Sequence, residues 1–316
     1  MRYAPIIIPT LNRYAHFQRC IESLKENSEA IESEIFIGLD FPLTKDHEYG
    51  YKKICAYLQT LNGFKSIHII KRTYNIGAIN NIKNLIAVVC NSYDRFIFTE
   101  DDNIFSPYFL EYINKGLNIF ENDKTIESIS GFSYPIKMPK SNTTVIKMQR
   151  YFSDWGFGTW KNRYYEAVSV LTNSFFQNLF RDKQRLKLLR TKSKKNFIRA
   201  FALMHDPNCR PYDYTNSIGQ ILLNRYSIMP KETLVKNTGW DNTGIHCAAN
   251  SALAQLFIDQ KLNVTTRISD FIFDDKESTK INKSIEKSPI GDYDRFTYYK
   301  VLIKSWMYRH DIGNIR

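Results

Sequence analysis

Short apolar runs alternate with segments of helical spacing through the first 120 residues, and this alternation constrains the fold more than any other feature. The apolar runs have the length of buried strands, and the segments between them place apolar residues on one helical face. The predicted strands are residues 4–9, 34–39, 66–70 and 94–102, and the predicted helices are residues 15–26, 49–61, 79–89 and 107–120. Strands that alternate with helices form right-handed βαβ units. The pattern therefore predicts an α/β fold with a mostly parallel sheet flanked by helices.

Polar side chains follow the ends of the predicted strands. Arg13 comes after the first strand, Asp40 after the second and Asn75 after the third. The fourth strand runs into Asp101 and Asp102. Because ligands of parallel sheets bind beyond the carboxyl ends of the strands, we expect these side chains to share one site.

The pattern is less regular after about residue 125. Residues 127–133 are consistent with one more strand, residues 174–203 look helical and strongly basic, and residues 295–310 have helical potential. Residues 227–237 fit either a short strand or a turn. Residues 274–292 are polar and charged, which predicts a loop or partial disorder.

The composition is that of a globular protein, with 43% hydrophobic and 24% charged residues in a chain of 316. No apolar run reaches 18 residues, so we expect no membrane-spanning helix, and the first apolar run is too short for a signal peptide. The five cysteines are scattered and form no CxxC pair, which predicts reduced thiols, a cytoplasmic protein and no cysteine-based zinc site. The net charge of +12 favours anionic partners, namely nucleic acid, phosphorylated small molecules or a lipid surface.

The sharpest motif is the acidic triplet Glu100-Asp101-Asp102 at the end of a hydrophobic strand. Adjacent carboxylates repel one another unless a cation or hydrogen-bond donors offset the repulsion. A divalent ion that bridges a diphosphate does so, because Mg²⁺ or Mn²⁺ takes one or two carboxylates and fills its other positions with phosphate oxygens and water. A solvated acidic turn is the alternative. The strand before the triplet and the helix start at Ser106-Pro107 favour the metal site.

Three segments carry a resemblance to known enzymes: residues 6–24, 75–86 and 95–113. They resemble the Golgi N-acetylglucosaminyltransferase of family 13 and the bacterial family 2-like sugar transferases related to it. The similarity covers about the first 135 residues and continues more weakly through residues 151–163 and 236–247. The resemblance implies a GT-A fold, a UDP-sugar donor and a Mn²⁺ or Mg²⁺ ion.

The resemblance also implies roles for individual residues. Asp102 matches the acid that binds the metal, Asp101 the acid near the donor ribose, and Glu100 the acid that touches the donor sugar. Arg13 matches an arginine at the uracil end of the donor site, and Asp40 an acid that accepts a hydrogen bond from uracil N3–H. For Arg13 a surface position stays open as an alternative, and for Asp40 a turn-forming role.

Two further residues complete the predicted donor site. Pro9 ends the first strand, and Asn75 follows the third in the turn Asn75-Ile76-Gly77. That turn suits a wall of the donor site, although it could equally serve only to start the next helix.

A transfer reaction needs a base for the acceptor hydroxyl. The bacterial relatives have an aromatic–Asp pair where this chain has Tyr212-Asp213, so the resemblance favours Asp213 as the base. An acid in a helix's first turn is the alternative reading of Asp213. Asp154 is the second candidate because it lies beside a Gly-rich loop that resembles the acceptor-facing loop of the family. The other candidates for the base are Asp206, Asp241 and His246.

Aromatic and histidine residues near these acids have two interpretations. Trp155 and Trp160 offer flat faces to sugar rings, or they belong to the core. His246 lies in a Gly–Thr–His–Cys-like ending shared with the bacterial relatives. Contact with the donor diphosphate or the acceptor suits His246 better than metal ligation does.

The sequence thus predicts an inverting glycosyltransferase that moves a sugar from a UDP-sugar to an acceptor hydroxyl. By resemblance, the acceptor is a glycan or lipid-linked glycan of bacterial surface polysaccharide or lipopolysaccharide synthesis. A sugar-phosphate nucleotidyltransferase is disfavoured because the turn after the first strand, PTLNR, has no glycine. A nucleic-acid binder is disfavoured because the basic run 181–199 is poor in aromatic residues, and we expect no nucleic-acid partner.

We expect the chain to divide into three parts. Residues 1–135 form the nucleotide-sugar-binding half. Residues 136–270 form the acceptor-binding and catalytic half, so the acceptor side lies in the C-terminal region, and residues 271–316 form a tail. The basic run 181–199 and the aromatic, basic tail 298–310 suggest the further hypothesis of peripheral attachment to an anionic membrane surface.

Overall fold

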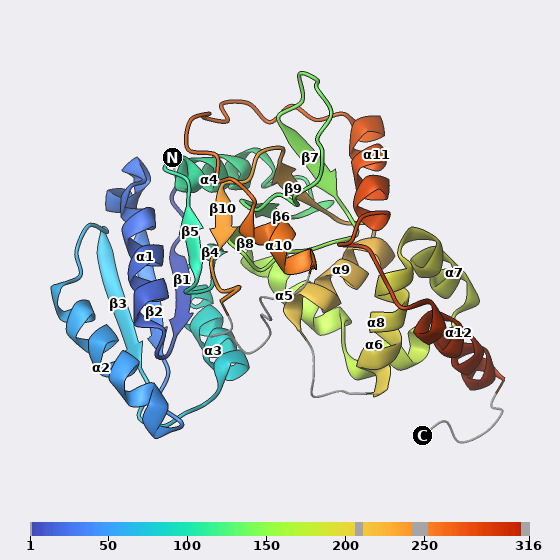
Figure 1. The fold of residues 1–316 in the computed structure, drawn as a ribbon, viewed down its shortest axis with the longest axis horizontal. Coiled ribbons are helices and arrows are strands. Elements are labelled where there is room, and N and C mark those ends of the chain that lie inside the picture. The colour runs from blue at the N-terminus through green and yellow to red at the C-terminus, as the bar shows by residue number, and fades with distance from the viewer. Residues whose placement is uncertain (1, 206–210, 242–251, 311–316) are drawn as a thin grey trace.

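The computed structural model describes residues 2–205, 211–241 and 252–310 (Figure 1). An eight-stranded sheet lies at the centre, in the order β3-β2-β1-β4-β8-β6-β9-β7, and a two-stranded ribbon, β10-β5, lies beside it. The sheet strands are β1 (Ile6–Thr10), β2 (Glu34–Leu39), β3 (Ser66–Lys71), β4 (Arg95–Phe98), β6 (Ile126–Ser130), β7 (Val145–Met148), β8 (Phe157–Trp160) and β9 (Tyr226–Pro230); the ribbon strands are β5 (Asn103–Phe105) and β10 (Val235–Asn237).

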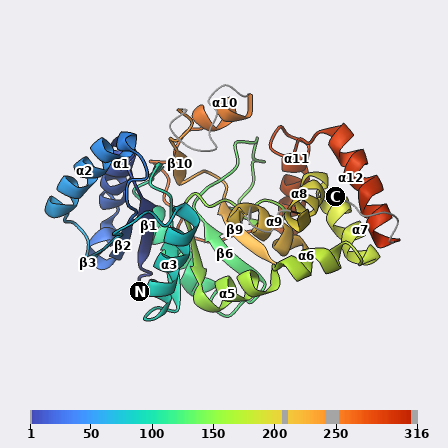
Figure 2. The same cartoon turned by 90° about the horizontal axis from the view of Figure 1, so that it is seen from below.

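Helices pack on both faces of the sheet and extend beyond its far end (Figures 1 and 2). They are α1 (Tyr14–Lys25), α2 (Lys45–Thr60), α3 (Ala78–Cys90), α4 (Phe109–Ile119), α5 (Lys161–Val170), α6 (Asn173–Leu179), α7 (Lys183–Lys192), α8 (Lys194–His205), α9 (Tyr212–Leu222), α10 (Ala252–Ile258), α11 (Asp275–Glu286) and α12 (Arg295–Arg309), with a 3₁₀ turn at Ser28–Glu32. The predicted α/β fold with a mostly parallel sheet flanked by helices is confirmed.

Alternation along the strands divides the core into two layers. Ile6 and Ile8 of β1 are buried with side chains of α1, α2 and α4, whereas Ile7 is buried with side chains of α3 and α5. Successive strand residues point to opposite faces, so a run of isoleucines fills both layers at once. A third apolar cluster joins α6, α7, α8 and α9 to α12.

The prediction of a loop or disorder at 274–292 is wrong for most of that segment, because Asp275–Glu286 forms α11. Its buried residues Ser278, Ile281 and Ile285 have helical spacing, and the many charged residues occupy the other face. Because most residues of this segment are charged or polar, the few buried positions at helical spacing gave only a weak helix signal in the sequence.

Among the residues that the structure describes, every helix is too short or too polar to cross a bilayer.

Candidate active site

The candidate site lies where β1 and β4 end side by side. The two strands are parallel, with Ile7 opposite Phe98, so the residues that follow each strand emerge at the same edge. Thr10 is the last residue of β1, Arg13 follows that strand, and the acidic triplet follows β4. The sheet topology therefore brings together the two sequence motifs that the strand pattern placed at one edge.

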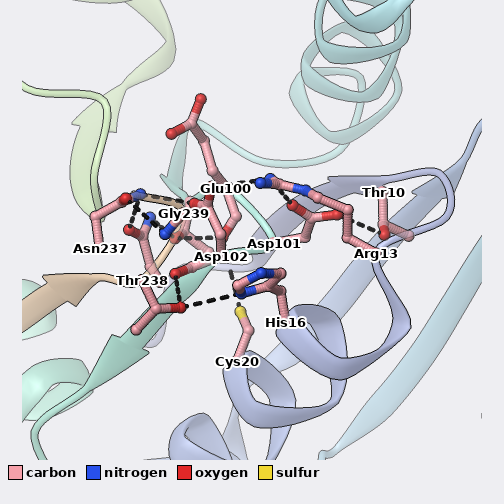
Figure 3. Close-up of polar contacts among 12 residues, drawn as sticks. Thr10, Arg13, His16, Cys20, Glu100, Asp101, Asp102, Asn237, Thr238 and Gly239 are labelled. Carbon is pink, nitrogen blue, oxygen red and sulfur yellow. Dashed lines mark hydrogen bonds and ion pairs between the residues drawn. The ribbon is translucent and has the colours of Figure 1, made fainter. Parts of the chain in front are cut away.

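Arg13 joins two acids of the triplet (Figure 3). Its Nη2 lies 2.6 Å from Asp101 Oδ1 and 2.9 Å from Asp102 Oδ2. The hydroxyl of Thr10 donates to the second oxygen of Asp101 at 2.8 Å. Asp101 and Asp102 are 6% and 4% exposed. Two carboxylates this deeply buried would destabilise the fold without these partners.

The pKa values of this cluster show burial and pairing in opposition. Burial raises the pKa of Asp101 above its ordinary value, and Arg13 and Thr10 only partly offset that rise. For Arg13, burial works to lower the pKa, but Asp101 and Asp102 outweigh it and raise the pKa. The guanidinium is therefore firmly charged, as a contact for anionic groups requires.

The β5–β10 ribbon brings a distant segment to Asp102. The side-chain amide of Asn237 donates to Asp102 Oδ1 at 2.7 Å, and the backbone N–H of Thr238 donates to the Asp102 carbonyl at 2.8 Å. A Cβ on Gly239 would lie 2.2 Å from Asp102 Oδ2, so any larger residue at this position would displace the carboxylate. The roles of these three residues were not predicted from the sequence, although they lie in the segment 236–247 that carries the weaker part of the resemblance.

His16 of α1 extends the network on the other side of Thr238. Its Nδ1 lies 3.2 Å from the Thr238 hydroxyl, and its Nε2 lies 2.8 Å from Asp241 Oδ2. Arg19 also contacts His16, at 2.8 Å. Asp241, a weaker candidate for the base, is thus engaged with His16.

Asp40 and Asn75 meet at the ends of β2 and β3. The Asp40 carboxylate accepts hydrogen bonds from the backbone N–H groups of Phe41, Ile76 and Gly77 at 2.9–3.0 Å. The Asn75 amide donates to the Phe41 carbonyl at 2.6 Å. Asp40 therefore ties the two loops together, and Pro9 lies within β1 opposite Gly38 of β2.

The third acid of the triplet belongs to a second acidic group. Figure 3 shows the Glu100 carboxylate pointing away from the Arg13 network. Burial raises the pKa of Glu100 to about 8, and Asp102, Asp101 and Asp213 contribute. Burial likewise raises the pKa of Asp154, with Asp213 and Glu100 as further causes. The chain thus places Glu100, Asp154 and Asp213 close enough to repel one another.

Glu100 and Asp154 line a pocket of about 260 Å³ on the α3 and α5 side of the sheet. Most of its lining is apolar, with Lys83 and Asn216 among the polar members. The apolar members include Ile82, Ile86, Phe98, Phe157, Tyr164 and Tyr212. A mostly apolar pocket with a few convergent polar groups is the usual form of a small-molecule site.

The two tryptophans differ. Trp160 is 4% exposed and lies under the guanidinium of Arg163, 3.4 Å from its ring centroid, so it is a core residue. Trp155 is partly exposed and packs edge-on against Phe132 and Trp240. Two other predicted residues, Asp206 and His246, lie outside the described residues.

The groups around Asp102 decide whether a divalent ion could bind there. Within the described ranges, no group of three or more His, Cys, Asp or Glu side chains gathers as a metal cage. Mg²⁺ and Mn²⁺ do not need one, since one or two carboxylates and substrate phosphates suffice. Asp102 can supply such a carboxylate; its Oδ1 contacts Asn237 and its Oδ2 contacts Arg13.

Comparison with solved structures finds distant similarities. The TarS 1–349 structure from S. aureus is 9% identical, with 97% of this chain and 81% of that chain covered and a TM-score of 0.44. The mannosyltransferase PcManGT from Pyrobaculum calidifontis, in complex with GDP-Man and Mn²⁺, is 11% identical, with 70% and 69% covered and a TM-score of 0.39. Such similarities are too remote to transfer a function.

Comparison with sequences is more decisive. No curated protein matches the chain. The specific resemblance to family 13 stays a prediction. A family model described as glycosyl transferase family 2 matches residues 6–206, which is more than half of the chain. This span contains both β1 with Arg13 and the acidic triplet after β4, and the chain belongs to glycosyl transferase family 2.

Proposed function

We propose that this glycosyltransferase is metal-dependent and inverting, and transfers a sugar from a UDP-sugar to an acceptor hydroxyl. One observation carries the proposal: the end of β4 directs Asp101 and Asp102 to Arg13 on one side and Glu100 toward Asp154 and Asp213 on the other. A nucleotide-diphosphate site and an acid–base site thus adjoin on one turn. A transferase needs this adjacency because the bond that breaks joins the sugar to the diphosphate.

The donor end of the proposal uses Arg13, Asp101 and Asp102. Arg13 presents a fixed positive charge to the anionic donor, and Asp101 accepts from the donor ribose. Asp102 would hold Mn²⁺ or Mg²⁺ through the carboxylate that contacts Arg13 and Asn237 in this structure. When bound, such an ion neutralises the departing diphosphate, which typically stabilises the transition state by several kcal/mol.

Asp213 is the proposed base. It lies in the first turn of α9, where the positive end of the helix dipole favours a carboxylate. Asp154 is the less suitable base because burial raises its pKa, which disfavours the ionised form that a base requires. Asp213 would take the proton from the acceptor hydroxyl while that oxygen attacks the anomeric carbon from the side opposite the diphosphate.

A thermal-shift panel tests the donor. We expect UDP-sugars to raise the melting temperature more in the presence of Mn²⁺ than in its absence, and more than GDP-sugars do. Asp102→Asn should abolish the Mn²⁺-dependent part of the shift. Asp46→Asn removes an equivalent charge from α2 and should behave like the parent. An Asp102→Asn protein that keeps the full Mn²⁺ response would refute the metal site.

The base is tested separately from the donor. Asp213→Asn should keep the UDP-sugar shift and reduce transfer by roughly 10²- to 10⁴-fold, the usual range for losing a general base. Asp154→Asn should reduce transfer less. The reverse order of the two losses would assign the base to Asp154.

The proposed acceptor is a glycan or lipid-linked glycan of a surface polysaccharide or lipopolysaccharide pathway. The apolar lining of the pocket beside Glu100 and Asp154 supports an acceptor with an apolar portion. Helix α12 supports peripheral attachment to an anionic membrane, since four large apolar side chains are exposed on it at helical spacing: Phe296, Tyr299, Ile303 and Trp306.

A further inference from the structure

A second pocket lies away from the candidate active site, between β7, α7 and α11, and has a volume of about 330 Å³. Strand β7 is antiparallel to β9, and its last residue, Met148, pairs with Ser227 near the start of β9. Strands β4 and β6 are both antiparallel to β8, and β9 is parallel to β6. Strand β9 therefore runs in the same direction as β4 and its parallel neighbour β1. The pocket therefore lies at the opposite end of the strands from Asp102.

Arg150 is the unusual member of this pocket. It is only 8% exposed, and among the described residues its guanidinium has neither a hydrogen-bond acceptor nor an ion-pair partner. An arginine this deeply buried ordinarily has a carboxylate or carbonyl partner, because an unpaired buried charge is strongly destabilising. Here Arg150 lines the pocket instead.

Two lysines add to the positive charge. Lys147 and Lys192 line the same pocket, against one carboxylate, Asp275, which is 75% exposed and 3.3 Å from Lys147. Burial lowers the pKa of Lys192, with repulsion from Arg150 and Lys283 as further causes. Arg150, Lys147 and Lys192 therefore bring three positive charges to a pocket that one carboxylate, Asp275, also lines.

Nearby groups do not remove this imbalance. Lys192 Nζ lies 3.3 Å from the amide oxygen of Gln149, which is neutral. Glu286 partly offsets the effect of burial on the Arg150 pKa, but its carboxylate accepts hydrogen bonds from the Tyr151 hydroxyl and the Lys194 backbone N–H. Glu286 does not line the pocket.

We propose that this pocket binds the phosphoryl group of a phosphate ester, held by Arg150, Lys147 and Lys192. A phosphoryl group presents several oxygens and up to two negative charges, so it can meet an arginine fork and two lysines together. Ser278 and Thr279 of α11 also line the pocket, and their hydroxyl groups suit phosphate oxygens. The phosphate comes either from a soluble ester or from a lipid headgroup.

Titration calorimetry with inorganic phosphate and with glycerol 3-phosphate tests the proposal, at constant ionic strength and with EDTA present. Arg150→Met should weaken binding at least about tenfold, the effect of losing one charge-assisted interaction. Arg150→Lys should retain part of it. Lys187→Met removes a charge from the exposed face of α7 and should bind like the parent.

Stability in the absence of phosphate gives an independent readout. If Arg150 serves a ligand and not the fold, Arg150→Met should melt at the same temperature as the parent or higher. A large fall in melting temperature would mean a structural role and overturn the proposal. Lys192→Met is a second variant for the calorimetry, with the same weakening of phosphate binding expected.

Vesicles distinguish the two sources of phosphate. The parent is sedimented with phosphatidylcholine vesicles, with and without phosphatidylglycerol. Binding to soluble phosphate esters that depends on Arg150 supports the site with a soluble ligand. Binding to phosphatidylglycerol vesicles that depends on Arg150 but not on Lys187 supports it with a lipid headgroup. Failure of both probes, or equal binding by Arg150→Met, would overturn the proposal without touching the transferase assignment.

Discussion

At the scale of single residues, Arg13 decides how two buried carboxylates coexist in the candidate site. One guanidinium nitrogen lies within 2.9 Å of an oxygen on each acid. Such a cluster is sensitive to small displacements, because moving one carboxylate leaves another charge buried and unpaired. Because Gly239 has no side chain and lies against Asp102, adding a single methyl group there would displace the Asp102 carboxylate by a small amount.

Gly239→Ala is predicted to abolish the Mn²⁺-dependent thermal shift and to reduce transfer by about tenfold or more. Its new Cβ would lie 2.2 Å from Asp102 Oδ2 and 3.3 Å from Arg13 Nη1, so Asp102 must move. The overpacking itself should cost about 1–3 kcal/mol of unfolding free energy. Thermal shift and activity assays measure the two effects.

Gly63→Ala is the control for that experiment. Gly63 has φ +93°, and the nearest atom to a Cβ there belongs to the flexible side chain of Lys25 at 3.0 Å. The variant should lose stability through backbone strain and keep the donor response. Loss of the Mn²⁺ response in both variants would show that reduced stability, and not Asp102, causes it.

Glu127 gives a pH-dependent prediction far from the proposed metal. It is 3% exposed on β6, and burial raises its pKa to about 7, against the lowering effects of Arg225 and Arg163. Between pH 4.5 and 7 the unfolded chain releases a proton that the folded chain keeps, so this group destabilises the fold as pH rises through that window. The effect is on the order of 3 kcal/mol at its upper limit.

Glu127→Gln should therefore gain stability relative to the parent as pH rises from 4.5 to 7, measured by urea unfolding at several pH values. Glu166→Gln is the matched control with the opposite sign and a lower pH window, because the hydrogen bond from Arg225 lowers the pKa of Glu166 below 4.5. A stability difference between Glu127→Gln and the parent that is constant with pH would contradict the raised pKa.

Sequence reasoning recovered the residues at strand ends and missed those that approach from elsewhere. Asp101, Asp102 and Arg13 follow strands whose direction is readable, so their meeting is predictable. Asn237 reaches Asp102 across 135 positions through the β5–β10 ribbon, whose three-residue strands are too short for a periodicity signal. Arg150 resembles any other basic residue until the fold buries it.

At the scale of elements, the strongly periodic segments were predicted within a few residues. Strand 34–39 coincides with β2, and the predicted helix 79–89 differs from α3 by one residue at each end. Strand β7 was missed, and its alternation is short. The predicted strand 94–102 ends early, because β4 stops at Phe98 and the acids lie in the turn after it. Propensity does not show where a ladder ends.

Helix α11 depends on a cap that the polar composition concealed. The Asp274 carboxylate accepts a hydrogen bond from the Glu277 backbone N–H at 2.7 Å. Asp274→Ala should cost about 1 kcal/mol of unfolding free energy, the usual value for an N-cap acid. Chemical denaturation measures it. Asp275→Ala removes the same charge one residue later without removing the cap, so it should cost less; equal losses would mean that charge and not capping stabilises this helix end.

At the scale of the whole molecule, charge and apolar surface coincide at the far end of the sheet. Helix α12 packs against α8 through Tyr298, Val301 and other residues of the third cluster, and α7 with its basic side chains lies in the same group (Figure 1). The face of α12 turned away from that cluster carries Phe296, 76% exposed, and Trp306, 49% exposed. Exposed aromatic residues beside cations are typical of helices that bind in a membrane interface.

The double variant Phe296→Ser/Trp306→Ser should lose co-flotation with anionic vesicles at low salt, whereas the parent should float. The aromatic side chains insert into the interface, and the basic residues of α7 add about 1 kcal/mol each near the lipid. Ile31→Ser/Leu43→Ser removes apolar groups that are 67% and 69% exposed near the start of the chain, and should float like the parent. Since all four side chains are exposed, transfer to a soluble acceptor should be unchanged, which separates attachment from catalysis. A parent that stays at the bottom of the gradient, or a double variant that floats with it, would leave the α12 surface without a role in membrane binding.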